Sequence, residues 1–332
     1  MLLCQNNFQH QALFCLYVLC RVPLAKDKFE GMLLTLLVPC LVCLFCLAAQ
    51  CHATPKGKDK DRRGACSTLF TRSPNAPHPI GRKPVFFLHI PKCGTSFEIS
   101  IAEYACPLLA EMSNPIKEKD LVRSQKNKIV KDLCPGKFSR FRNGHEPLTL
   151  KARRGQAGHV VLMLRPPLTR IVSGYLHNFH DCIGMQEKYG VMENGPRRDA
   201  AMDKDSVILE YAKCVRGCAA RMLTGEHCGL TPGRRRKSKT GEKRQALMAL
   251  KILDRAAFVG MTDYWEESVC LFEAMYGGNF TGSTLTNVRP SPQAGRNWTD
   301  VLVNHGFEDW ADEALYVRSK EKFKKLKSVY FV

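Results

Sequence analysis

The amino-acid sequence predicts an α/β fold in which helices cover both faces of a parallel β-sheet, a three-layer sandwich. Three segments support this prediction, because each is a short apolar run followed by a turn and an amphipathic stretch. Repeated strand–turn–helix units are typical of parallel sheets. Ligands of such folds bind at the carboxyl ends of the strands, where the turns lie.

The first unit spans residues 85–104. Its apolar, aromatic run at 85–90 predicts a buried strand, and a turn follows at 91–94. Thr95 or Ser96 can then cap a helix that continues to residue 104.

The second unit begins with an apolar run at 160–164, again typical of a buried strand. This strand is followed at once by Arg165. Pro167 suits the first position of the next helix, which we expect at 168–179.

The third unit has a short strand at 257–260. Thr262 or Asp263 can cap the helix that follows, in which Trp265 and later apolar residues recur at helical spacing. The end of the chain, residues 309–327, is expected to form a last helix.

The amino-terminal residues 1–50 are expected to be a targeting region. Within it, residues 31–49 carry no charge and are just long enough to cross a hydrocarbon core of about 30 Å. They form either a signal anchor behind a cytosolic tail, or a signal peptide cleaved near the small residues that follow. A polar, basic stem linker is expected at 51–83, so the folded domain occupies 84–332.

Glycosylation patterns and cysteine content indicate an oxidising compartment. Asn279 and Asn297 both stand in the Asn-x-Thr acceptor pattern. The chain has 16 cysteines, a number more natural in a secretory lumen than in the cytosol. We therefore expect the folded domain to face the lumen.

Four cysteines lie close together in the sequence and could form one or two disulfides, with pairing left open: Cys182, Cys214, Cys218 and Cys228. The alternative is a zinc site that uses some of these thiolates with His227. An oxidising compartment favours disulfides.

Charge favours polyanionic partners. Lysine and arginine total 50 against 31 acidic residues, a formal net charge of +19. Such a bias suits nucleic acid, an anionic membrane surface, or acidic substrates and cofactors. A luminal location argues against nucleic acid. The basic run at 234–239 is either a solvated loop or a rim that attracts an acidic polymer.

The turn after the first strand has the composition of a phosphate-binding loop. A helix amino-terminus offers free N–H groups, and Gly94 lets the backbone approach an anion closely. Lys92 adds a positive charge, and Thr95 and Ser96 add hydroxyl donors. The loop of nucleotide triphosphatases differs, because its lysine follows the last glycine.

The run His-Ile-Pro-Lys-Cys-Gly-Thr-Ser at 89–96 resembles the cradle of the carbohydrate sulfotransferases, which transfer a sulfuryl group from 3′-phosphoadenosine 5′-phosphosulfate (PAPS). The resemblance implies a P-loop-like fold and a 5′-phosphosulfate held by residues 92–96, with Lys92 stabilising the leaving oxygen. Cys93 stands where many members have threonine, and the turn has one glycine fewer.

A second match to the same family begins at Arg165. Leu-Arg-Pro-Pro at 164–167, followed by Ser-Gly-Tyr at 173–175, is similar to the family's Leu-Arg-(Asp)-Pro and Ser-x-Tyr. The resemblance assigns Arg165 and Ser173 to the 3′-phosphate of PAPS. Pro166 replaces the usual aspartate.

A third match, Asn-Gly-His-Glu-Pro at 143–147, resembles the segment that carries the catalytic base in this branch of the family. Histidine has a pKa suited to taking the proton of a sugar hydroxyl. We therefore expect His145 to be the base, with Glu146 a weaker candidate. His89 is expected either to pack inside the strand or to orient the loop.

Segments at 258–268 and 312–316 also resemble the family, so the resemblance covers about residues 84–325. It implies a Golgi type II membrane sulfotransferase, anchored through 31–49, or a secreted one, that sulfates a glycan or polysaccharide without a metal. The alternative from another class is an inactive glycan-binding protein of the same fold. A kinase that uses the cradle with ATP is disfavoured, since no metal-holding aspartate is evident.

Overall fold

Three parallel strands form the sheet of the computed structural model: β1 (Val85–Leu88), β2 (His159–Leu164) and β3 (Phe258–Met261), in the order β1-β2-β3. The model describes residues 66, 70–79, 85–106, 108, 145–150, 159–190, 202–230, 237–277, 285 and 296–332. The α/β class and the three predicted strands are confirmed. β1 ends two residues earlier than expected, and β3 is shifted by one.

The register places three turns at one edge of the sheet. Leu88 pairs with Leu162 and Leu164 pairs with Met261, with all strands running in the same direction. The turns after β1, β2 and β3 therefore emerge side by side.

Helices follow each strand as the sequence pattern predicts. α4 (Phe97–Ala105) follows β1, α8 (Pro167–Leu176) follows β2, and the 3-10 turn η3 (Thr262–Tyr264) leads from β3 into α13 (Trp265–Tyr276). Thr262 and Asp263 thus lie in the 3-10 turn and do not cap α13. α8 ends at Leu176, three residues before its expected end.

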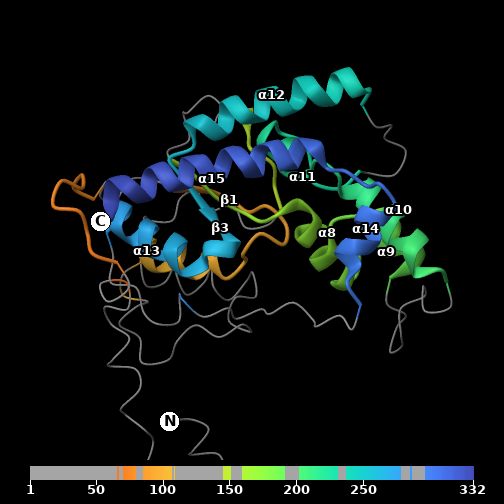
Figure 1. Ribbon diagram of the computed structural model, residues 1–332, viewed down its shortest axis with the longest axis horizontal. Helices are drawn as coiled ribbons and strands as arrows, with labels where there is room; N and C mark the ends of the chain where they lie inside the picture. The colour runs from red at the N-terminus through yellow and green to blue at the C-terminus, as the bar shows by residue number, and fades with distance from the viewer. Residues whose placement is uncertain are drawn as a thin grey trace, which may run out of the picture. The chain divides into compact units, whose positions relative to one another are not determined.

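The remaining helices pack around this frame: α9 (Ile183–Tyr189), α10 (Lys204–Val215), α11 (Cys218–Leu223), α12 (Lys239–Arg255), α14 (Trp298–Asn304) and α15 (Trp310–Tyr330). Figure 1 shows α12 and α15 above the sheet and α13 below it. The predicted final helix is confirmed and extends three residues beyond 327.

Aromatic side chains tie the first and third units together beneath the sheet. Phe97 of α4 stacks on Phe258 of β3 at 5.6 Å, and Phe272 of α13 meets both rings edge-on at 5.2 Å. All three side chains are fully buried. Burial of this apolar surface fixes α4, and hence the turn before it, against α13.

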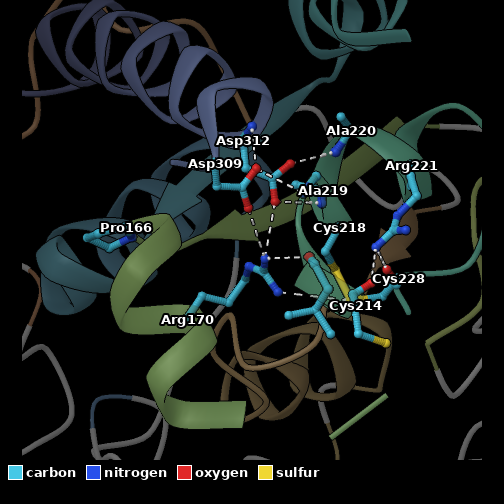
Figure 2. A network of polar contacts seen from close by, with 12 residues as sticks. Pro166, Arg170, Cys214, Cys218, Ala219, Ala220, Arg221, Cys228, Asp309 and Asp312 are labelled. Carbon is cyan, nitrogen blue, oxygen red and sulfur yellow. Dashed lines mark hydrogen bonds and ion pairs between the residues drawn. A yellow bond between two sulfur atoms is a disulfide. The ribbon is translucent and has the colours of Figure 1, made fainter. Parts of the chain in front are cut away.

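A buried ionic network joins α8, α11 and α15 (Figure 2). Nη2 of Arg170 donates to the carbonyl of Val215 at 3.1 Å and to Oδ2 of Asp312 at 3.3 Å. Asp312 also accepts the N–H groups of Ala219 and Ala220, both at 3.0 Å, at the start of α11. A carboxylate at a helix amino-terminus satisfies otherwise unpaired N–H groups. Asp312 thus has a structural role, because it joins α15 to both α8 and α11.

Disulfides hold the same region. Cys182 pairs with Cys214, and Cys218 pairs with Cys228, so the predicted disulfides are confirmed. Because all four cysteines are disulfide-bonded, none is left as a thiolate ligand, and the alternative prediction of a zinc site is wrong. A further disulfide joins Cys66 to Cys270.

No helix among the described residues is both long and apolar enough to cross a membrane. The predicted membrane segment at 31–49 lies outside the described residues.

Candidate functional site

The turn between β1 and α4 is built from two residues in the left-handed region. Lys92 has φ of 62° and Gly94 has φ of 80°. The N–H of Cys93 donates to the carbonyl of Ile90 at 3.1 Å, which closes the turn. The N–H of Phe97 donates to the carbonyl of Gly94 at 3.0 Å and begins the helix. The turn thus resembles an anion-binding nest, in which successive backbone N–H groups line a concave site.

Three consecutive amides of this turn are available to a ligand. Within the described residues, the N–H groups of Gly94, Thr95 and Ser96 donate to no acceptor. They lie at the amino-terminal end of α4, where the helix dipole is positive. The donor set therefore fits a phosphate or sulfate oxygen cluster.

Glycine is required at position 94 for two reasons. Its φ of +80° is unfavourable for other residues, and a β-carbon there would lie 2.9 Å from Cζ3 of Trp265. The indole at the start of α13 therefore packs directly on the cradle.

Cys93 shapes the turn from inside. Its side chain is 1% exposed, and burial raises the pKa of its thiol to about 12. Its backbone N–H donates to the carbonyl of Ile90. Cys93 is therefore neither a thiolate nucleophile nor a donor to a ligand, and its contribution is to hold the turn against the backbone of Arg165.

Arg165 follows β2 directly and lies at the same edge as the cradle. Its Nε donates to Oγ1 of Thr169 at 3.2 Å, and burial lowers the pKa of the guanidinium. The side chain is half-buried, and the carboxylate of Asp263, after β3, is close enough to favour its charge. A fixed cation beside the cradle suits a second phosphate.

Ser173 lies inside α8, two turns after Arg165, and is 2% exposed. The side chain faces the interior. At the neighbouring Gly174, an added β-carbon would clash with the side chain of Tyr211. The geometry thus supports a ligand contact at Arg165 more directly than at Ser173.

His145 lies beside the cradle. Its ring meets the ring of His89 at 4.9 Å, and Nε2 of His89 lies 3.3 Å from Oγ1 of Thr95. Nδ1 of His89 in turn contacts Glu98 at 3.1 Å, so His89 joins the loop at Thr95 to α4. The 145–150 segment is tethered by the N–H of Leu148, which donates to the carbonyl of Met222 at 2.9 Å.

The sequence interpretation missed a turn at 177–182 that completes this site. Nδ1 of His145 lies 2.8 Å from Oδ1 of Asp181, and the ring of His180 lies 4.7 Å from the ring of His145. The signal was present as two histidines and an aspartate within five residues after a helix. Only the fold brings them to His145.

Unusual backbone geometry marks the same turn. Asn178, Phe179 and Asp181 all have positive φ, at 53°, 52° and 63°. Such conformations are costly outside glycine and concentrate at functional sites. Neighbouring groups stabilise the turn in this conformation. The hydroxyl of Tyr211 donates to the carbonyl of His180 at 2.8 Å, and Cys182 is disulfide-bonded.

Electrostatics affect His180 and Asp181 of this turn differently. Burial lowers the pKa of His180 to about 3, and the nearby charge of Lys92 acts in the same direction. For Asp181, burial opposes ionisation, but the hydrogen bond and charge of His145 outweigh it and lower the pKa. His180 is therefore neutral near pH 7, and Asp181 is ionised.

His145, His180 and Asp181 are also the one group of possible cation ligands among the described residues, with candidate atoms within 4.8 Å of one another. Two imidazoles and a carboxylate suit zinc or iron. Their direct contact, with Nδ1 of His145 on Asp181, is equally the arrangement of an oriented base.

Other predicted positions are distributed as follows. Asn297 is exposed at the start of α14, where it donates to Oδ2 of Asp300 at 2.8 Å. Asn279 lies outside the described residues, as do 234–236 of the basic run. Lys237 of that run pairs with Glu226, and Ser238 caps α12.

Comparison with protein-family models, with curated protein sequences and with solved structures found no match. Any functional conclusion therefore depends on the residues and geometry described above.

Proposed function

We propose that this protein is a PAPS-dependent sulfotransferase that moves a sulfuryl group to a hydroxyl of a glycan or polysaccharide, with a fold of the P-loop-like sulfotransferase type. The observation that carries the proposal is the contact of His145 with His89, at 4.9 Å between ring centroids. This contact brings a candidate base beside the anion cradle, in which the N–H groups of Gly94, Thr95 and Ser96 donate to no acceptor among the described residues.

Two anion positions support the choice of donor. The amides of Gly94, Thr95 and Ser96, with Lys92, suit the 5′-phosphosulfate. Arg165, at the end of the neighbouring strand, suits the 3′-phosphate. A doubly phosphorylated nucleotide would bridge the two turns at the sheet edge.

In the proposed step, Nε2 of His145 takes the proton of an acceptor hydroxyl. The acceptor oxygen forms a bond to sulfur as the bond from sulfur to the bridging phosphate oxygen breaks. The products are a sulfated glycan, adenosine 3′,5′-bisphosphate and protonated His145. Lys92 and the cradle amides stabilise the negative charge on the departing phosphate.

The disulfides and the exposed Asn297 support a luminal site of action. We propose a Golgi location with anchoring through residues 31–49. The net charge of +19 would help to gather PAPS and an anionic glycan.

The test is transfer of label from sulfur-labelled PAPS to a panel of glycans by the purified full chain, expressed through an oxidising compartment. We expect transfer to at least one glycan, with loss of 10²-fold or more, roughly, in His145→Ala and Lys92→Ala. Glycan binding without any turnover would instead support the inactive glycan-binding protein. Full transfer by both variants would contradict the proposed roles.

A further inference from the structure

Asp181 is the residue that faces Nδ1 of His145. Its two carboxylate oxygens lie 2.8 Å and 2.7 Å from that nitrogen. The two side chains are 22% and 23% exposed, so the contact is largely shielded from water. A carboxylate only accepts, so Nδ1 must carry the proton, and Nε2 of neutral His145 is left as an acceptor.

We propose that Asp181 is a positioning residue that holds His145 in the tautomer and orientation required of the base. This inference rests on the proposed transferase function. Asp181 touches neither the donor nor the acceptor in this account, because it acts through the imidazole of His145. Its negative charge stabilises the imidazolium that forms during transfer.

The fold holds Asp181 firmly enough for this role. Its backbone has φ of 63°, and the next residue is fixed by the Cys182–Cys214 disulfide. Its carbonyl packs on the neighbouring loop so closely that a β-carbon at Gly229 would lie 1.6 Å from it. A surface ion pair would not need this support.

The groups around the pair favour an oriented base. His180 meets the edge of His145 at 4.7 Å and stays neutral, so it adds no positive charge that would oppose protonation of His145. Among the described residues, the other charged or titratable groups that face the pair include His89, His177, Tyr211 and Lys92. The positive charge of Lys92 opposes protonation of His180, and the carboxylate of Asp181 acts in the opposite direction.

The first experiment needs no turnover. Nitrogen-15 chemical shifts of the histidine rings in the full chain report the tautomer of His145. We expect the Nδ1–H tautomer in the wild type and a mixture of both tautomers in Asp181→Asn. Asp181→Glu, which keeps the carboxylate, should restore part of the Nδ1–H population. Asp254→Asn, which removes an exposed carboxylate paired with Arg318, is the matched control and should leave the tautomer unchanged.

The second experiment measures the kinetics of transfer. Asp181→Asn should lower kcat by about 10²-fold or more, with KM for PAPS within about twofold of wild type. A change in KM alone, or an unchanged tautomer, would overturn the proposal.

A third experiment tests the cluster as a metal centre. Zinc is titrated into the full chain while the ring resonances are followed. No shift at micromolar zinc supports the base–carboxylate pair. Stoichiometric binding that shifts both His145 and His180, and that is lost in His180→Ala, would overturn it. Correct tautomer behaviour without any sulfuryl transfer would retain the pair and contradict only the proposed function.

Discussion

A β-carbon at Gly94 would lie 2.9 Å from Cζ3 of Trp265, and Gly94 itself has φ of +80°. The cradle is therefore shaped both by backbone conformation and by the indole that begins α13. These two effects can be separated, because Gly306 shares the conformation without the contact. Gly306 has φ of +66° and no atom within 4 Å of the corresponding β-carbon.

We expect Gly306→Ala to lower the free energy of unfolding by about 1 kcal/mol, the cost of placing a side chain in the left-handed region. Gly94→Ala should lose roughly a further 1–3 kcal/mol, because Trp265 or the turn must move. Urea denaturation measures both values. Equal losses in the two variants would contradict the packing of the indole on the cradle.

The buried guanidinium of Arg170 should be the most costly cation to remove. It is 3% exposed and lies among Asp309, Asp312 and the carbonyl of Val215. Arg170→Met keeps much of the volume but leaves two buried carboxylates without their cation, at a cost of about 3–5 kcal/mol. Thermal and urea unfolding would measure the loss.

Arg318→Met is the matched control for that experiment. Arg318 is 49% exposed and pairs with Asp254 and Glu321. An exposed pair contributes at most about 1 kcal/mol. A loss in Arg170→Met no larger than in this control would show that the network does not hold α8 to α15.

His180 should make the fold sensitive to mild acid. Its pKa is about 3 in the folded chain and near 6.5 in the unfolded chain. Between these values the unfolded chain binds a proton that the folded chain does not, so stability falls as pH drops from 6.5 towards 3.

Between pH 7.5 and pH 5, the wild type should lose up to about 2 kcal/mol more than His180→Asn, in which this proton cannot bind. Denaturant unfolding at the two pH values gives the difference. Parallel pH dependences of the two chains would contradict a neutral, buried His180.

Arg165 should distinguish nucleotides by their 3′-phosphate. Under the proposed function, Arg165→Ala weakens binding of adenosine 3′,5′-bisphosphate by about 10- to 100-fold, which corresponds to a lost charge-assisted contact. Binding of adenosine 5′-phosphate should change by no more than about twofold. Titration calorimetry with both nucleotides makes the comparison. An equal loss for both would place Arg165 elsewhere than at the 3′-phosphate.

The local parts of the structure could be predicted from the sequence. The strands at 85–88, 160–164 and 258–260 are continuous apolar runs, and the turn at 91–96 gathers residues that suit a strand-to-helix anion site. Neighbouring residues determine such features, so the α/β class and the cradle's position follow from short segments.

The end of α8 could not be predicted in the same way. Its helical pattern continues to Phe179, yet Asn178 and Phe179 adopt positive φ. The N–H of His180 bonds to the carbonyl of Gly174 at 3.0 Å, and Tyr211 holds the turn from another helix. Tertiary contacts override local preference here, against the ordinary preference of phenylalanine.

The pairing of His145 with Asp181 was also beyond local patterns. The two residues are 36 positions apart, and the strand β2 and helix α8 lie between them. The contacts of His145 with Asp181 and with His89 bring the turn after α8 beside the cradle. Because no local sequence pattern links His145 to Asp181, the sequence alone did not predict that they form one site.

The most direct test of the central claim is equilibrium binding of adenosine 3′,5′-bisphosphate to the full chain and to Lys92→Ala, measured by titration calorimetry. Lys324→Ala, which removes an exposed lysine of α15, is the control. We expect saturable one-to-one binding by the wild type and the control, and affinity weaker by about tenfold or more in Lys92→Ala. No binding by the wild type at millimolar nucleotide, or equal binding by Lys92→Ala, would contradict the assignment of this turn as the nucleotide cradle.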